Sequence, residues 1–129
     1  MTVGVVLLSH SGTLAAGAAE LAGQLAGETR IAPAGGTADN GLGTSIDRLA
    51  AAVSSVASDD GVVIIADLGS AVLTARTYLA DEEDLPCPVV LADAPFTEGA
   101  VAAAVLASSG AALAEVHAAA EDAWKHRKT

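Results

Sequence analysis

One stretch, Val3-Gly4-Val5-Val6-Leu7-Leu8-Ser9-His10-Ser11-Gly12, guides the interpretation of the whole chain. Its first part, residues 3–8, is uncharged and rich in valine and leucine, which is typical of a parallel strand buried on both faces. A short polar turn follows, and an alanine-rich helical pattern begins at Thr13. This order places His10 at the carboxyl end of a central strand. Ligands bind at that edge of open α/β sheets, so His10 is the first candidate for a reactive group.

The composition limits the class of protein. The 129 residues fit a single domain, which we predict to span residues 1–129. Hydrophobic residues make up 52% of the chain and aromatic residues 2%, so we expect a core of alanine, valine, leucine and isoleucine. The net charge of −10 and the six lysines and arginines argue against nucleic-acid binding, which requires clustered basic residues.

Several features favour a cytoplasmic protein. The N-terminus has neither a basic region before an apolar run nor a small-residue cleavage site, so no signal peptide is expected. The longest uncharged stretch, Gly99–Leu113, is mostly alanine and too short to span a membrane. Cys87 is the single cysteine, which excludes an intramolecular disulfide and fits a reducing compartment.

The hydrophobic pattern predicts strands that alternate with helices. Leu14, Leu21 and Leu25 share one face of the first helix, and we expect this face to be buried. Thr97 is the expected N-cap of the fourth helix, and Trp124 is expected to cover an edge of the core or to lie in a dimer contact. The expected strands are 3–8, 29–33, 62–66 and 87–91; the expected helices are 13–27, 46–56, 70–80, 97–109 and 112–125, with an acidic turn at 81–84.

This alternation predicts an α/β fold with an open, mainly parallel sheet, right-handed crossovers and helices on both faces. The expected strand order is 2-1-3-4, with a possible extra strand at one edge. Strands one and three are then neighbours whose helices leave on opposite faces, which opens a crevice between their carboxyl ends. His10 ends strand one and Asp67 ends strand three, so the two residues are expected to meet there.

A histidine beside a carboxylate has its tautomer fixed by one ring nitrogen and can attack an electrophile with the other. The surroundings favour a phosphoryl group, because Ser11-Gly12 and Gly69-Ser70 open two helices whose backbone N–H groups converge. The three histidines and one cysteine show no metal-ligand spacing, so no metal site is expected. The predicted phosphoryl-binding residues are Ser9, Ser11, Gly12, Thr44, Gly69 and Ser70.

Four segments in order give a specific resemblance. They are Val5–Ser11, the glycine-rich loop closing in Gly43-Thr44-Ser45, Ile64–Ala71, and Ala94–Gly99 with Ala107–Ala111. Together they resemble the DhaM family, the phosphotransferase subunits of dihydroxyacetone kinases that use the bacterial phosphoenolpyruvate-dependent phosphotransferase system (PTS). The resemblance covers essentially the whole chain and implies the fold of mannose-class IIA domains. The sequence Asp67-Leu68-Gly69-Ser70-Ala71 differs from the Phe-Gly-Gly type that follows this aspartate in mannose-class sugar transporters, and points to the dihydroxyacetone branch.

The resemblance implies a phosphotransferase of glycerol metabolism that acts through a phosphohistidine. His10 would accept a phosphoryl group on Nε2 from phospho-HPr, the phosphocarrier protein of the PTS, with Asp67 as hydrogen-bond partner. The group would pass to ADP on the DhaL subunit, and the resulting ATP would phosphorylate dihydroxyacetone on the DhaK subunit. ADP, ATP and magnesium are therefore expected on DhaL, with no cofactor on this chain. A homodimer, a separate HPr and no membrane partner are also implied.

Two alternatives remain at this point. One is a phosphorylation-receiver switch with Asp67 as acceptor, which is weakened because Ser9-His10-Ser11 replaces the acidic cluster that holds magnesium in such proteins. The other is a non-catalytic flavodoxin-like module that binds an anion or serves in signalling.

Overall fold

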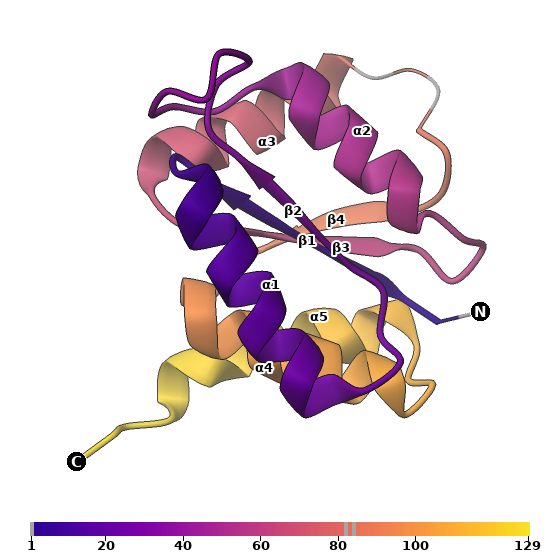
Figure 1. The fold of residues 1–129 in the computed structure, drawn as a ribbon. Helices are drawn as coiled ribbons and strands as arrows, with labels where there is room; N and C mark the ends of the chain where they lie inside the picture. Colours follow the sequence, from indigo (N-terminus) through magenta and orange to yellow (C-terminus); the bar gives the residue numbers. More distant parts are fainter. Residues whose placement is uncertain (1, 82, 84) are drawn as a thin grey trace.

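The computed structural model describes residues 2–81, 83 and 85–129, and it shows a parallel sheet between two layers of helices (Figure 1). The strands lie in the order β2-β1-β3-β4, so the predicted fold class is confirmed. Among the described residues no fifth strand joins the sheet. The elements are β1 Gly4–Ser9, α1 Gly12–Ala26, β2 Ile31–Gly35, α2 Ile46–Val56, β3 Val62–Ala66, α3 Gly69–Asp81, β4 Val89–Ala92, α4 Phe96–Ser108, α5 Leu113–Asp122 and the 3-10 turn η1 Ala123–Lys125.

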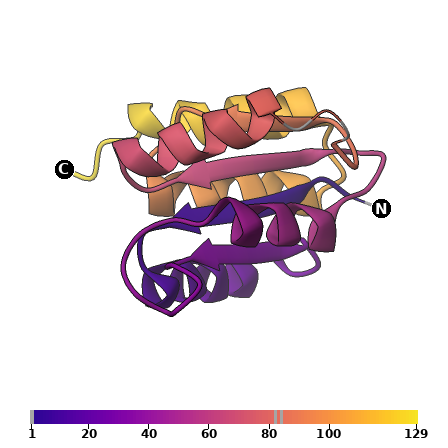
Figure 2. The same cartoon turned by 90° about the horizontal axis from the view of Figure 1, so that it is seen from above.

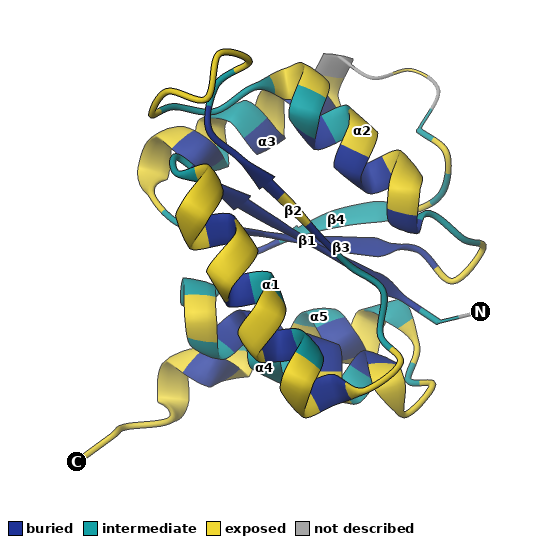
Figure 3. Ribbon diagram, viewed as in Figure 1, coloured by how far each residue is buried: buried dark blue, intermediate teal, exposed yellow. Residues whose placement is uncertain are grey.

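The two central strands are buried along their whole length (Figure 3). Because side chains alternate along a strand, β1 and β3 supply both layers of the core. Val5 and Leu7 pack with α1, α4 and α5, whereas Val6 and Leu8 pack with α2 and α3. Seen from above, these helices lie along the strands (Figure 2). The core is mainly alanine, valine, leucine and isoleucine, as the composition predicts.

Two close backbone approaches hold the two ends of β1 against its neighbours. A Cβ atom on Gly35 would lie 2.5 Å from the carbonyl oxygen of Ser11, so glycine allows the end of β2 to lie against the start of α1. A Cβ atom on Gly4 would lie 2.5 Å from the carbonyl oxygen of Val56, where the end of α2 lies against β1. The first contact holds the β1–α1 turn against β2, and the second holds the start of β1 against α2.

The structure corrects the predicted burial of α1. The buried residues of this helix are Ala15, Ala18, Ala22 and Ala26, while Leu14, Leu21 and Leu25 are exposed. Small side chains let the helix approach the sheet and α4 closely, and the leucines lie on its flank. The sequence pattern places the apolar residues on one face, but it does not distinguish a close alanine contact from a leucine contact.

Some element ends also differ from the prediction. β2 begins at Ile31 rather than residue 29 and continues through Pro33, which an edge strand tolerates because one side of its backbone faces solvent. Thr97 was expected as the N-cap of α4, but that position is occupied by Pro95. Trp124 is largely exposed, and its indole N–H donates to the carbonyl of Asp93 at 3.0 Å. The predicted acidic turn includes residues 82 and 84, which lie outside the described residues.

Candidate functional site

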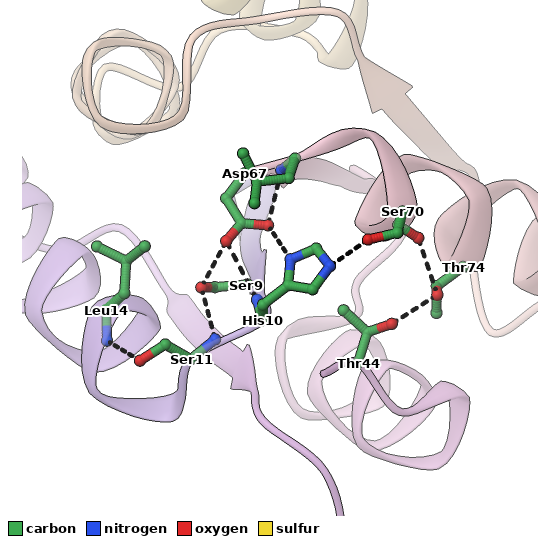
Figure 4. Close-up of polar contacts among 9 residues, drawn as sticks. Ser9, His10, Ser11, Leu14, Thr44, Asp67, Ser70 and Thr74 are labelled. Atoms are coloured by element: carbon green, nitrogen blue, oxygen red, sulfur yellow. Dashed lines mark hydrogen bonds and ion pairs between the residues drawn. The ribbon is translucent and has the colours of Figure 1, made fainter. Parts of the chain in front are cut away.

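The turn between β1 and α1 carries His10. β1 ends at Ser9 and α1 begins at Gly12, with Ser11 as N-cap accepting a hydrogen bond from the backbone N–H of Leu14 at 3.1 Å. β1 pairs in parallel with β3, and the register places Leu8 opposite Ala66. The residue after each strand end therefore lies at the same edge, and His10 meets Asp67 although they are 57 positions apart (Figure 4).

The carboxylate of Asp67 is held by the residues around this turn. Oδ1 lies 2.9 Å from Nδ1 of His10 and accepts the backbone N–H of Leu68 at 2.7 Å. Oδ2 accepts the hydroxyl of Ser9 at 2.9 Å and the backbone N–H of His10 at 3.1 Å. The Asp67 side chain is 8% exposed and that of His10 is 24% exposed, so the carboxylate lies inside and the ring faces the solvent edge.

These hydrogen bonds decide the protonation of the pair. Burial raises the pKa of Asp67, but the hydrogen bonds from His10, Ser9 and Leu68 outweigh burial and hold this pKa below its ordinary value. Asp67 is therefore a carboxylate at neutral pH and can only accept hydrogen bonds. In the neutral imidazole of His10, the proton then resides on Nδ1 and is donated to Asp67, while Nε2 keeps its lone pair.

Polar contacts continue from the outer nitrogen of His10 through Ser70 of α3. Nε2 is hydrogen-bonded to the hydroxyl of Ser70, an exposed residue in the first turn of α3. Thr74 donates to the backbone carbonyl of Ser70 at 3.2 Å, and its hydroxyl lies 2.6 Å from that of Thr44 (Figure 4). Thr44 is therefore linked to Ser70 through Thr74 of α3 rather than by direct contact with the ring.

The predicted phosphoryl-binding residues occupy different places around this ring. Ser70 contacts it directly, and Gly69 lies beside Ser70 at the N-terminus of α3. Gly12 lies at the N-terminus of α1, where the hydroxyl of Ser11 is already used as the cap. Ser9 is fully buried; its hydroxyl donates to Asp67 and accepts the N–H of Ser11 at 3.0 Å. The Ser9 side chain thus positions Asp67.

A loop between β2 and α2 supports the turn from outside. Its Gly43 N–H donates to the carbonyl of His10 at 2.8 Å, and Gly36 N–H donates to the carbonyl of Ser9 at 3.3 Å. Arg48 of α2 fixes this loop with hydrogen bonds to the carbonyls of Gly35 and Ala38 and to the side chain of Asn40, at 3.0 to 3.2 Å. Arg48 is not among the site residues predicted from the sequence.

A hollow opens on the other side of Asp67, between α3 and the end of β4. It has a volume of about 520 Å³, and Asp67, Gly69, Arg76, Phe96 and Trp124 are among the residues that line it. Arg76 is directed to this hollow rather than paired with the His10 site. Within the described part of the chain, no lysine or arginine forms a hydrogen bond or ion pair with His10, Asp67 or Ser70.

Comparisons with known proteins agree with this architecture. Residues 4–117 match the EIIA-man family, described as the PTS system fructose IIA component. The phosphoryl donor subunit DhaM of PEP-dependent dihydroxyacetone kinase 2 from Listeria innocua is 37% identical over 106 residues, which cover 80% of this chain and 84% of that protein. The chain belongs to the EIIA-man family, among its DhaM members.

Other DhaM relatives are longer. The phosphoryl donor subunit DhaM of the Escherichia coli K12 kinase is 40% identical over 119 residues, covering 88% of this chain but 25% of that protein. The present chain thus spans about a quarter of the length of that relative. A crystal structure of a protein of unknown function shares 34% identity, with a TM-score of 0.82 and 95% of both chains covered.

The EIIA-man fold also occurs in a more distant protein. A sigma-54 interaction domain protein from Enterococcus faecalis has 17% sequence identity and a TM-score of 0.69, with 96% of this chain and 91% of that one covered. At this identity the comparison supports the shared fold alone. In the described part of the present chain, every helix is too short or too polar to cross a bilayer.

Proposed function

We propose that this EIIA-man domain is a phosphohistidine carrier: His10 accepts a phosphoryl group from phospho-HPr and transfers it to ADP bound on a DhaL subunit. The observation that carries the proposal is the 2.9 Å contact between Nδ1 of His10 and Oδ1 of Asp67, which leaves Nε2 on the solvent side. A relative named as the phosphoryl donor subunit of a PEP-dependent dihydroxyacetone kinase gives the system in which such a carrier acts.

In the first transfer, the lone pair of Nε2 attacks phosphorus, and the N–P bond of phospho-HPr breaks. The electron pair of that bond returns to the histidine of HPr, while His10 gains an Nε2–P bond. The imidazole of His10 then carries a positive charge, because Nδ1 retains its proton. The adjacent carboxylate of Asp67 stabilises this charge, and the proton on Nδ1 of His10 need not move.

In the second transfer, an oxygen of the terminal phosphate of ADP attacks phosphorus, and the Nε2–P bond breaks. The electron pair returns to Nε2, and ATP is formed on the partner. The phosphorylated imidazole carries a positive charge that it loses as the Nε2–P bond breaks, which makes the ring a good leaving group. Ser70 is placed to hold the phosphoryl oxygens once Nε2 is occupied, and the N-termini of α1 and α3 offer backbone N–H groups.

The proposal includes the partners and location. The chain would act in the cytoplasm as a homodimer, with HPr as donor and the DhaL and DhaK subunits on the acceptor side. ADP, ATP and magnesium would be held by DhaL, so this subunit needs no cofactor of its own. The final acceptor of the phosphoryl group would be dihydroxyacetone.

A receiver switch with Asp67 as acceptor fits the site less well. Both oxygens of Asp67 accept two hydrogen bonds each, and the side chain is almost fully buried. An attack by either oxygen on phosphorus would break bonds that hold the turn. By contrast, Nε2 of His10 becomes available to attack phosphorus once the hydroxyl of Ser70 rotates away from it.

Incubation with phosphoenolpyruvate, enzyme I and HPr tests the proposal. We expect a mass increase of one phosphoryl group that is stable in base and labile in acid, mapped to the peptide with His10. The His10→Ala variant should remain unlabelled, and His117→Ala should be labelled as the wild type. Label that persists in His10→Ala and disappears in Asp67→Asn would favour the receiver instead, and no label on the wild type would favour the non-catalytic module.

A further inference from the structure

The short segment Gly43-Thr44 connects the two elements on either side of the His10 ring. The N–H of Gly43 donates to the backbone carbonyl of His10 at 2.8 Å. The hydroxyl of Thr44 lies 2.6 Å from that of Thr74, which donates to the carbonyl of Ser70 at 3.2 Å (Figure 4). Ser70 in turn contacts Nε2 of the ring. The segment therefore links the turn that carries the ring to the helix that carries its outer partner.

The loop of residues 36–43, which leads into this segment, buries few apolar groups. Its two residues with apolar side chains, Ala38 and Leu42, are both exposed. Gly36 and Asn40 have positive φ angles of 75° and 65°, so the loop turns sharply at two places. Because apolar burial contributes little here, the conformation of the loop depends on its polar contacts.

Arg48 supplies such contacts from the first turn of α2. Its Nη1 donates to the carbonyl of Gly35 at 3.0 Å. Its Nη2 donates to the carbonyl of Ala38 and to the side-chain oxygen of Asn40, both at 3.2 Å. The backbone N–H of Arg48 donates to the hydroxyl of Ser45, the N-cap of α2, at 3.2 Å. The planar guanidinium thus holds three oxygens in one arrangement, which the ammonium group of a lysine does not reproduce.

We propose that Arg48 is a positioning residue for phosphoryl transfer to His10. It acts through the loop, which fixes the turn that carries the ring and, by way of Thr44, the start of α3. The inference rests on the proposed function and adds a residue on which its rate depends. In the described part of the chain, the guanidinium donates to loop oxygens and not to the ring, so the effect is indirect. Misplacement of a reacting group by about 1 Å can lower a rate about 100-fold.

Arg30 provides a matched control at the opposite edge of the sheet. This residue precedes β2, and its guanidinium donates to the carbonyls of Thr2 at 3.0 Å and Ala57 at 3.4 Å. Both arginines therefore hold backbone carbonyls, but Arg30 does so where the strands begin. Arg30→Lys removes the same kind of contact far from the turn that carries His10.

The first test compares Arg48→Lys, Arg48→Gln and Arg30→Lys in single-turnover phosphorylation of His10 at saturating phospho-HPr. We expect the rate to fall about tenfold in both Arg48 variants and to stay within about twofold in Arg30→Lys. Phosphoramidate, a small phosphoryl donor, should show the same tenfold loss in label mapped to His10, because the change lies in the placement of the ring.

Two outcomes of this test would overturn the proposal. A normal rate in Arg48→Lys together with a loss in Arg48→Gln would show that the positive charge matters and not the arrangement of the loop. A loss with phospho-HPr but not with phosphoramidate would place the effect of Arg48 in the contact with a protein donor.

The second test needs no donor and separates placement of the ring from folding. At about pH 8, where an ordinary imidazole is neutral, nitrogen NMR of the wild type should show the proton of His10 on Nδ1. Arg48→Lys should mix the two ring tautomers and raise the hydrogen-exchange rate of the Gly43 N–H about tenfold, with an unchanged far-UV circular dichroism spectrum. Asn40→Gly keeps the positive φ and removes one acceptor of Arg48, so it should change both signals less.

The NMR results also distinguish this inference from the proposed function. Unchanged ring and Gly43 signals in Arg48→Lys, or equal changes in Arg30→Lys, would overturn the positioning role of Arg48. If the signals change as expected but phospho-HPr does not label the wild type, the proposed function would fail while the placement of the ring by Arg48 would hold.

Discussion

Two imidazole–carboxylate pairs of equal length and very different surroundings occur among the residues that the structure describes. Nδ1 of His10 lies 2.9 Å from Asp67, and Nε2 of His117 lies 2.9 Å from Glu121. The first pair joins the ends of two strands, whereas the second joins residues four apart on α5. The Asp67 side chain is 8% exposed and the Glu121 side chain is 42% exposed. Distance alone therefore does not identify a reactive histidine.

The two pairs differ most in which ring nitrogen they leave available. Asp67 takes the inner Nδ1, so the outer Nε2 of His10 is directed to the edge of the sheet. Glu121 takes the outer Nε2 of His117, and the same oxygen also accepts the backbone N–H of Asp93 at 2.9 Å. The second pair fastens α5 to the end of β4, which is a structural role.

The largest expected effect is that of Asp67→Asn on phosphoryl transfer. An amide donates a hydrogen bond to Nδ1 and so moves the ring proton to Nε2, which removes the attacking lone pair. We expect a loss of about 100-fold in the rate of His10 phosphorylation by phospho-HPr. Glu121→Gln, the matched change in the second pair, should alter the rate by less than about twofold. Similar rates for the two variants would contradict the distinction between the pairs.

Ser70→Ala tests the outer side of His10. The hydroxyl of Ser70 contacts Nε2 and is placed to bind the phosphoryl oxygens, and the second histidine has no such contact among the described residues. We expect the rate of transfer to fall about tenfold, which corresponds to one lost hydrogen bond to a charged group. Single-turnover labelling at saturating phospho-HPr measures this step. A rate equal to that of the wild type would show that backbone groups alone hold the phosphoryl group.

Ser9→Ala tests the support of the buried carboxylate. The variant removes one of the four hydrogen bonds to Asp67 and the acceptor of the Ser11 N–H. The free energy of unfolding in urea should fall by about 1 kcal/mol. Ser55→Ala serves as the control, because the hydroxyl of Ser55 bonds only to a carbonyl of its own helix at 2.7 Å. An equal loss in both variants would mean that Ser9 contributes no more than an ordinary helix hydroxyl.

The smallest expected effect concerns acid stability. The pKa of Asp67 is lowered in the folded chain, so its stabilising contribution is complete above the unfolded value of about 3.9 and is lost as the pH falls through the folded value. Urea unfolding between pH 5 and pH 2 should show a shallower decline for Asp67→Asn than for the wild type. The pKa of Glu121 is also lowered, chiefly by the N–H of Asp93, so Glu121→Gln should flatten the same range. Parallel curves for Asp67→Asn and the wild type would contradict the assignment.

Much of this arrangement could be predicted from the sequence, because the central strands are unambiguous. The valine and isoleucine run at residues 62–66 has the predicted bounds, and the strand order follows from alternating elements. His10 and Asp67 meet because parallel neighbours end at the same edge. Their proposed roles in phosphoryl transfer stay predictions.

The remaining parts depend on how the helices pack, which periodicity does not report. Thr74 belongs to the site because α3 lies beside the start of α2, where Thr44 is. A sequence clue existed, since Thr74 follows Ser70 by one helical turn. Arg48 fixes the path of the glycine-rich loop by hydrogen bonds, and no sequence pattern specifies that path. The leucines of α1 were predicted to be buried, but they are exposed because alanines make the close contacts of this helix with the core.

The pairing of Leu8 with Ala66 has a consequence for how this protein tolerates change in length. The segment from Gly12 to Gly61 could lengthen or shorten in its surface turns while the two strand ends remain side by side. Removal of one residue inside β3, however, would turn the carboxylate to the opposite face of the sheet. Natural variation in length should therefore accumulate in the connection between β1 and β3 and not within these two strands. The distance between the His10 ring and the Asp67 carboxylate is thus set by the pairing of the strands and not by the length of the loops.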